Sequence, residues 1–371
     1  MDLALRPGPA PDLTLRVTLA TAKLGGADSV FVPDHLIGLL PPSIWQPDDI
    51  GAARLLPGIN AHYEPWTVLG YLAAKNTRLR WGIGVTDAAR RHPAVTAQAA
   101  ATLHQLSRGK AILGLGPGER ENNEPFGIDW TRPVARFEEA MATIRALWDS
   151  NGAPISRDSA YFPLRDAVFE IPPYRDTRPG IWVGAHGPRM LRAVGRYADG
   201  WFPAYPQPVQ DYRRRLDRIR NEAADAGRDP LSIVPAALLF VITGHSDADV
   251  ENAVDSLGAR AFGLCMSADL WRRHGLEHPL GPGFSGIQDL LPQTLDRATV
   301  LSGVEQIPVS MIREYCVTGT PTQIQDQLAE WRDGGLEYPV LVNVSSFRPD
   351  VTRGLSSGVP FIRALRKIRR L

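Results

Sequence analysis

The chain has 371 residues with 44% hydrophobic content, and its 41 basic and 40 acidic side chains leave a formal net charge of +1. This length can bury a large core, and the balanced charge provides no field that would favour nucleic acid as a partner. Two cysteines without a C-x-x-C spacing, no apolar run long enough for a transmembrane segment and no signal-peptide pattern together favour a cytoplasmic location.

The sequence shows no spacing typical of a metal site. His274 and His278 are four residues apart, but Gly275 and Pro279 disturb any helix that would bring the two rings together. We therefore expect no bound metal.

Apolar periodicity predicts alternating helices and strands along the chain. Residues 1–11 contain three prolines and a glycine and are predicted to be loop. The predicted elements that follow are a helix over 13–24, a strand over 30–32, a helix opening at 65, a strand over 80–85, a helix over 94–106, a strand over 111–115, a helix over 135–148, a strand over 181–183, a helix opening at 188, a very short strand at 201–202, a helix over 212–223, a strand over 233–242, a helix over 321–331, a strand over 340–344 and a closing helix over 361–371.

Seven strands that alternate with helices favour an α/β fold of the (β/α)8 TIM-barrel type. We expect a single domain over residues 1–371, with irregular insertions at about 151–179 and 245–318, where Gly and Pro interrupt the pattern. Such a barrel opens with a strand, and none is found ahead of the helix over 13–24. The first strand is therefore predicted to be missing or shortened.

Polar residues directly follow the first predicted strand. Pro33 ends that strand, and Asp34 and His35 come immediately after it. In an alternating β/α chain the carboxyl ends of the strands form the active face. The alternative, an Asp that caps the next helix and a His that only packs, is equally common for such a pair taken alone.

Glycine-containing strand ends occur at three further places: Gly84-Val85, Gly116-Pro117-Gly118-Glu119, and Gly184-Ala185-His186-Gly187-Pro188. Glycine lets the main chain approach a ligand, and a helix beginning at Pro188 leaves free N–H groups that suit a phosphate. The spacing does not match G-x-G-x-x-G, which disfavours a Rossmann domain. Glu119 is expected to face the mouth of the barrel, with a helix cap or an Arg partner as its alternative role.

Two apolar or basic segments leave alternatives open. Residues 36–45 form an apolar loop, which suits a hydrophobic substrate or a lid, although a loop folded back onto the core is at least as common. The tail over 361–371 has an apolar side and five basic residues, so contact with a membrane surface is conceivable. A closing helix with a solvated basic face is the commoner case.

These residues together resemble the luciferase-like oxidoreductase superfamily, and within it the branch that uses the deazaflavin coenzyme F420. The resemblance is closest to the phthiodiolone/phenolphthiodiolone dimycocerosates ketoreductases and covers nearly the whole chain. It rests on Asp34-His35, Gly84-Val85, residues 92–99, residues 113–119 with Asn123-Glu124, residues 185–188 with Gly200-Trp201, and on the segments 63–67, 85–88, 186–192 and 284–286.

The resemblance implies a barrel whose mouth holds coenzyme F420, often in a homodimer. It implies a cis peptide bond between Gly84 and Val85 behind the central ring of the coenzyme and a position for His35 nearest the reacting carbonyl. Asp34 and Glu119 would approach the coenzyme, and the main chain of Gly187 would help to hold its phosphate side. The remaining residues implied to bind the coenzyme are Gly84, Val85, Gly116, Gly118, Ala185 and His186.

Two departures qualify what the resemblance implies. Leu39 stands where the sugar-phosphate dehydrogenases of this branch have a Trp, so a sugar phosphate is not the expected substrate. Relatives also begin with a strand ahead of the first helix, of which only the last residues are expected in Met1-Asp2-Leu3, as if the sequence began late.

The function we expect is transfer of hydride from reduced F420 to the ketone of a long-chain hydrophobic lipid, giving a secondary alcohol. His35 would donate to the carbonyl oxygen and Glu119 would balance charge at the coenzyme. Residues 36–45 and the insertion near 271–284 would enclose the oily chain. The alternatives are an FMN-dependent monooxygenase with the same fold and a catalytically silent homologue that binds cofactor.

Overall fold

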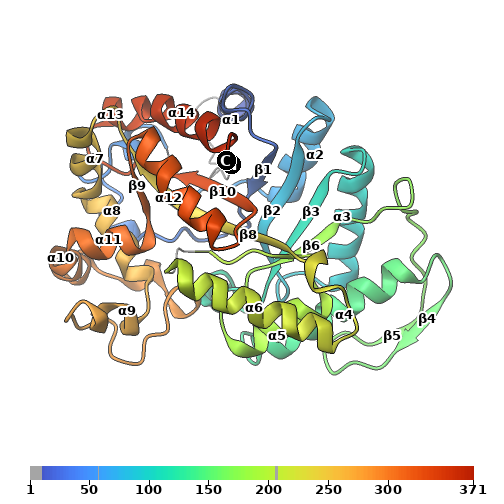
Figure 1. The fold of residues 1–371 in the computed structure, drawn as a ribbon. Coiled ribbons are helices and arrows are strands. Elements are labelled where there is room, and N and C mark those ends of the chain that lie inside the picture. The colour runs from blue at the N-terminus through green and yellow to red at the C-terminus, as the bar shows by residue number, and fades with distance from the viewer. Residues whose placement is uncertain (1–10, 57, 205–207) are drawn as a thin grey trace.

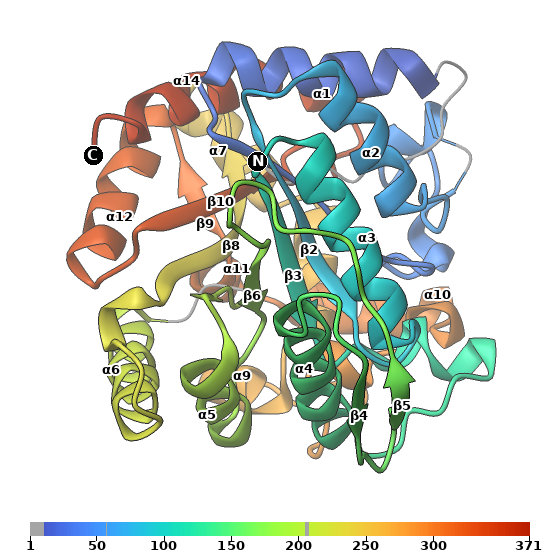
Figure 2. The ribbon, with the colours of Figure 1, turned by 90° about the vertical axis from the view of Figure 1, so that its right-hand side faces the viewer.

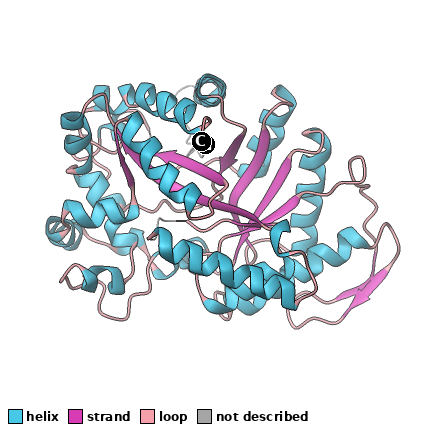
Figure 3. Ribbon diagram, in the orientation of Figure 1, coloured by secondary structure: helices cyan, strands magenta, loops and turns pink. Residues whose placement is uncertain are grey.

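The computed structural model describes residues 11–56, 58–204 and 208–371 (Figure 1). Seven parallel strands follow one another through the sheet in chain order, and helices lie outside them (Figure 3). The seven are β1 (Ser29–Val32), β2 (Arg80–Asp87), β3 (Ala111–Gly116), β6 (Gly180–Val183), β7 (Gly200–Trp201), β8 (Val234–Thr243) and β10 (Tyr338–Asn343). This is the parallel α/β fold of the TIM-barrel type, as the strand count predicted.

The missing or shortened first strand was predicted for residues 1–3, which lie outside the described residues. The description begins with helix α1 (Pro11–Gly25), and β1 is the first strand after it. The expected loop over residues 1–11 lies outside the described residues, except that Pro11 already belongs to α1. The strand path starts at β1 and ends at β10, so a first barrel strand would belong between these two.

The structure differs from the predicted insertions in two places, although the short helical pieces predicted for 245–318 are confirmed. Segment 151–179 contains an antiparallel hairpin of β4 (Ile155–Arg157) and β5 (Leu164–Ala167). At the end of segment 245–318 begins β9 (Val317–Gly319), an eighth strand that pairs with the end of β8. These strands have three or four residues, too few to show an alternating pattern. The hairpin projects from the body of the molecule, as Figure 2 shows.

Apart from those of the second insertion, eight helices of the described residues lie outside the sheet after α1, and all but α13, which was not predicted, agree with predicted helices to within a few residues. Five of them begin at a proline, which is favourable because the N–H of the first helical residue has no partner within the helix. The eight are α2 (Pro65–Lys75), α3 (Pro93–Leu106), α4 (Pro133–Asp149), α5 (Pro188–Tyr197), α6 (Val209–Asp225), α12 (Pro321–Asp333), α13 (Val351–Ser356) and α14 (Gly358–Ile368). The second insertion adds α7 (Asp247–Val254), α8 (Leu257–Ala261), α9 (Ala268–Arg273), α10 (Arg297–Gln306) and α11 (Val309–Tyr315).

Large aromatic side chains fill the space enclosed by the strands. The rings of Phe31 and Phe202 have centroids 5.1 Å apart, and Trp182 packs against both. Glycines opposite them supply the room: a Cβ on Gly82 would lie 2.3 Å from the Phe31 ring, and one on Gly200 would lie 2.6 Å from the Trp182 indole. The interior is therefore closed below the carboxyl ends of the strands.

A second hydrophobic cluster joins the loop after β1 to the second insertion. Leu40 and Ile44 are buried there together with Phe262 and Trp271. The loop over 36–45 thus folds largely back onto a core, the alternative that the sequence left open. Trp271 is part of this core and does not enclose a ligand.

The closing helix α14 packs against α1 and α12, which is the structural role expected for the tail. Among the residues described, no helix combines the length and the apolar character that crossing a bilayer requires.

Candidate functional site

An open cavity lies at the carboxyl ends of the parallel strands. The space between its lining residues, open solvent included, is about 950 Å³. Eight of the predicted site residues line it: Asp34, His35, Gly84, Val85, Gly116, Gly118, Glu119 and His186. The other lining residues are Leu39, Thr86, Asp87, Arg90, Pro117, Asn122, Gly184, Phe202, Ala204, Leu238, Phe240, Ile287 and Gln288.

Two predicted residues lie beside the cavity. Ala185 is buried, and its carbonyl oxygen accepts a hydrogen bond from the Trp201 indole at 2.9 Å. Gly187 is exposed and precedes the first residue of α5, so that helix begins next to the cavity residue His186. The amino terminus of α5 is a favourable place for an anionic group of a bound ligand.

The side chain of Val85 is surrounded by glycines from neighbouring elements. The peptide bond between Gly84 and Val85 is cis, as the resemblance implied. A Cβ on Gly116 would lie 3.0 Å from Val85 Cγ2, and one on Gly184 would lie 3.8 Å from the same atom. Val85 therefore has room on the cavity floor because these neighbours lack side chains, and a flat ring can lie over this floor.

Gly118 brings Glu119 into the cavity by a turn that other residues resist. Its φ angle is +92°, and a Cβ there would lie 2.2 Å from Asp87 Oδ2. Asp87 is itself held by a hydrogen bond from the side-chain amide of Asn123. Burial raises the pKa of Asp87 above its usual value.

Neighbouring side chains bind both oxygens of the Asp34 carboxylate. Thr86 donates to Asp34 Oδ2 at 2.6 Å, Arg91 pairs with the same oxygen at 2.7 Å, and Arg90 lies 3.0 Å from Oδ1. The side chain is only 4% exposed. Although Asp34 lines the cavity, its side chain therefore anchors the loops after β1 and β2.

Asn122 fixes the orientation of His35. Its side-chain oxygen accepts hydrogen bonds from the backbone N–H groups of Leu36 at 2.7 Å and Ile37 at 3.1 Å, so its NH2 group must point the other way. That NH2 group lies 2.9 Å from Nδ1 of His35. A hydrogen bond to a bare Nδ1 places the imidazole proton on Nε2, where it is a donor.

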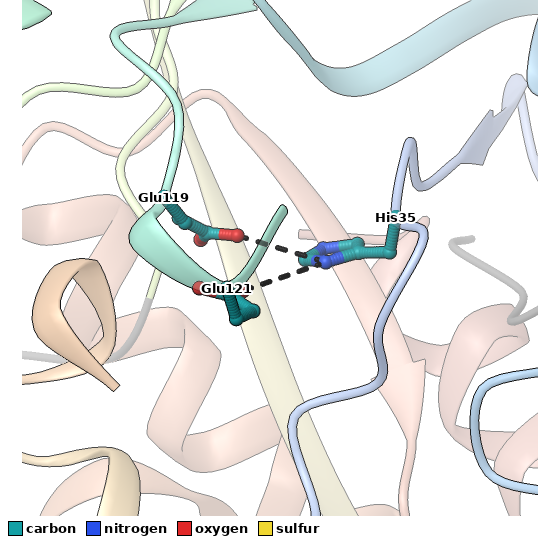
Figure 4. A group of neighbouring side chains, drawn as sticks. All are labelled: His35, Glu119 and Glu121. Carbon is teal, nitrogen blue, oxygen red and sulfur yellow. Dashed lines mark ion pairs between the residues drawn. The ribbon is translucent and has the colours of Figure 1, made fainter. Parts of the chain in front are cut away.

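Two glutamates lie close to the same imidazole (Figure 4). Glu119 Oε2 is 3.6 Å and Glu121 Oε1 is 3.9 Å from His35 Nδ1. Glu119 is 27% exposed and lines the cavity, whereas the Glu121 side chain is fully buried. Burial and the neighbouring Glu119 carboxylate raise the pKa of Glu121 to about 11, so it is a neutral acid at pH 7.

His35, Glu119 and Glu121 also offer ligand atoms within 4.8 Å of one another, which is close enough for a metal ion. The NH2 group of Asn122 lies among them, 3.0 Å from Glu121 Oε1 and 3.4 Å from Glu119 Oε2. Since its nitrogen lies within 3.4 Å of an acceptor on each of the three residues, hydrogen bonds connect the cluster. The geometry favours proton chemistry at this site.

Sequence reasoning missed Asn122 and Glu121. Both belong to a short 3-10 turn, Arg120–Asn122, within a run of polar residues from 119 to 124 that has no periodicity. Only the neighbouring Glu119 was singled out, because it follows a glycine at a strand end.

One side of the cavity is apolar. Leu39 comes from the loop after β1, Phe240 from β8 and Ile287 from the second insertion. The insertion therefore reaches the cavity, but through residues 287 and 288 and not through the predicted segment 271–284. This wall suits a hydrophobic substrate.

The chain is similar in sequence to known proteins. Residues 13–338 match the family model described as luciferase-like monooxygenase. The chain is 54% identical over 363 residues to a phthiodiolone/phenolphthiodiolone dimycocerosates ketoreductase of Mycobacterium tuberculosis (strain ATCC 25618 / H37Rv), covering 97% of this chain and 95% of the relative.

Two solved structures have a similar fold at 19% identity. An F420-dependent secondary alcohol dehydrogenase in complex with an F420-acetone adduct gives a TM-score of 0.74 and covers 97% of this chain and 95% of that one. The coenzyme F420 dependent tetrahydromethanopterin reductase of Methanopyrus kandleri gives 0.72, with coverage of 99% and 96%.

Proposed function

The chain belongs to the luciferase-like monooxygenase family and is an oxidoreductase, and from this premise we propose that it is an F420-dependent ketoreductase. Its substrate would be the ketone of a long-chain hydrophobic lipid similar to phthiodiolone, and its product a secondary alcohol. The 54% identical relative is named for a reaction of this type, and two structures with the same fold are named for F420.

The residues present fit a deazaflavin. A flat ring system would lie over Val85 and over the main chain of Gly116 and Gly184, where no side chain blocks it. The amino terminus of α5 would face the phosphate of the coenzyme. When bound in reduced form, the coenzyme supplies a hydride. The protein must then stabilise the charge that grows on the carbonyl oxygen of the substrate.

The observation that carries the proposal is the fixed tautomer of His35. Because Nδ1 of His35 accepts a hydrogen bond from Asn122, the proton is on Nε2, which can donate it to a substrate oxygen. The lipid chain would lie along the wall formed by Leu39, Phe240 and Ile287. Glu119, at the cavity surface, would balance charge as the coenzyme is oxidised.

Titration of the coenzyme-free protein with F420 and with FMN tests the proposal, followed by mixing reduced F420 with long-chain ketones. We expect tight binding of F420 and consumption of the reduced coenzyme only when a ketone is present. Preferential binding of FMN would instead indicate the monooxygenase chemistry of other family members. Binding of F420 without turnover of any hydrophobic ketone would indicate a silent homologue.

For assembly and location we propose a homodimer in the cytoplasm that binds its lipid substrate in solution or at a membrane surface. Sedimentation velocity would report the subunit number directly.

A further inference from the structure

Glu121 lies behind the cavity wall formed by its neighbours. Its side chain is fully buried, and its Oε2 has no hydrogen-bond partner among the described residues. The charged or titratable groups that face it are Glu119 on its own segment, His35 after β1 and Arg90 after β2. A bare carboxylate in this position would bury an uncompensated charge, whereas a neutral acid does not.

The hydrogen-bond count around Asn122 requires one additional proton. The Asn122 NH2 group has two hydrogens, and three acceptors lie within 3.4 Å of its nitrogen: one on His35, one on Glu119 and one on Glu121. Two hydrogens cannot serve three acceptors fully. Every acceptor in the cluster has a hydrogen when one of the three groups carries a proton of its own.

Proton donation by His35 also requires a proton close to its Nδ1 atom. Transfer of the Nε2 proton to a substrate alkoxide would leave the neutral imidazole as an anion, which is strongly unfavourable unless Nδ1 gains a proton. The groups nearest to Nδ1 that could supply it are Glu119 at 3.6 Å and Glu121 at 3.9 Å. Of these two, the buried Glu121 retains a proton at neutral pH.

We propose that Glu121 stores the proton that His35 passes to the substrate, and this proposal rests on the proposed ketoreductase function. Hydride adds to the carbonyl carbon, the new alkoxide takes the proton from His35 Nε2, and His35 Nδ1 takes the proton shared by Glu121 and Glu119. Glu119 would accept the one proton that oxidation of a bound deazaflavin releases, which restores the carboxyl pair, and proton exchange with solvent would return His35 to the Nε2–H tautomer. One ketone and one reduced coenzyme thus give one alcohol and one oxidised coenzyme.

The proton can move with small side-chain rotations. When His35 Nδ1 is bare, Asn122 donates to it and to Glu121. When Nδ1 is protonated, the two hydrogens of Asn122 can face Glu121 and Glu119, and Nδ1–H faces the carboxyl pair. Glu121 therefore acts through its neighbours, without touching the substrate.

The test uses the full-length protein and two variants. Glu121→Gln keeps the shape and neutrality of the acid but cannot release a proton, and Glu124→Gln changes an exposed glutamate on the adjacent turn as the matched control. Infrared spectra of the coenzyme-free proteins at pH 8 should show the C=O band of a protonated carboxyl in wild type and Glu124→Gln that is missing in Glu121→Gln. Absence of this band from wild type would overturn the proposal, whatever the reaction catalysed.

Single-turnover oxidation of bound reduced F420 by a ketone provides the second readout. In Glu121→Gln we expect the rate to fall at least about tenfold and to decline as the pH rises, because the proton for Nδ1 must then come from the solvent. Coenzyme affinity should stay within about twofold of wild type.

A Glu121→Gln enzyme with the rate and pH profile of wild type would show that Glu121 is only structural. If wild type itself does not oxidise the coenzyme, the proposed function fails while the infrared result still decides where the proton is held.

Discussion

Asn122 donates a hydrogen bond to Nδ1 of His35 at 2.9 Å, although 87 positions separate the two residues in the chain. The contact joins the turn after β3 to the loop after β1. It also determines which imidazole nitrogen presents a proton to the cavity, because the amide oxygen is held by two backbone N–H groups. The first two predictions follow from this pair.

Replacement of Asn122 by Asp should impair turnover nearly as strongly as loss of His35. One carboxylate oxygen can still accept from Leu36 and Ile37, but the other would face Nδ1 and draw the imidazole proton to it, leaving Nε2 without a hydrogen. We expect a fall in kcat of about 100-fold or more, within the range that a general acid contributes. Nitrogen NMR of the histidine ring would show the changed tautomer, and an unchanged Nε2–H tautomer would contradict the explanation.

His35→Ala should abolish turnover while leaving coenzyme affinity nearly intact. The imidazole lies at the cavity surface, whereas the floor on which a deazaflavin would lie is made by Val85 and glycines. A loss of about 10² to 10⁴ in rate is expected for removal of a general acid. Stopped-flow measurement separates binding from chemistry, and a variant with a normal rate would remove His35 from the mechanism.

Gly118→Ala should destabilise the protein more than Gly127→Ala. Both glycines have positive φ angles, +92° and +73°, so both substitutions introduce backbone strain of about 1 kcal/mol or more. Only at Gly118 would the new Cβ also meet Asp87, at 2.2 Å from Oδ2, while the space around Gly127 is open. Urea unfolding of the two variants isolates the effect of the clash, and equal losses would show that Asp87 moves aside freely.

Asp34→Asn should reduce stability by about 3 to 5 kcal/mol, the usual cost of removing one partner from a buried ion pair. The change weakens the pairing of Arg90 and Arg91 at a carboxylate that is 4% exposed. Asp129→Asn is the control, since Asp129 pairs with Arg136 at a side chain that is 53% exposed, and this variant should lose much less stability. If both variants unfold at the same urea concentration, the Asp34 cluster does not anchor the loops.

The residues after the strands could be predicted because two independent patterns meet there. Short apolar runs such as Val30 to Val32 mark buried strands, and Pro33 or a glycine marks where each strand ends, so the place of His35 and of Glu119 follows from the parallel fold. The structure indeed brings these two side chains to 3.6 Å. Their roles in catalysis and binding stay predictions.

Glu121 could not be predicted in this way. It lies between Arg120 and Asn122 in a polar run that is typical of a solvated loop, and its burial results from tertiary contacts of a three-residue turn. For the loop over 36–45, burial could be predicted but the contacts could not. Its apolar composition shows that it avoids water, but whether it contacts a ligand or the second core cluster depends on where the insertion folds.

The stability of the protein should depend on pH through Glu121. Burial and the neighbouring Glu119 raise the pKa of this carboxyl from its ordinary value of 4.5 to about 11 in the folded protein. Between these pH values the folded protein therefore binds a proton that the unfolded chain has lost. The free energy of unfolding therefore receives a contribution that falls as the pH rises, by at most about 1.4 kcal/mol per pH unit.

Glu121→Gln removes this slope because an amide does not titrate. Urea unfolding at pH 5, 7 and 9 should show the variant gaining stability relative to wild type at each step, while Glu124→Gln follows wild type. A constant difference between Glu121→Gln and wild type across this range would mean that the buried carboxyl is ionised in the folded protein, because only a group whose protonation changes on unfolding can alter the slope.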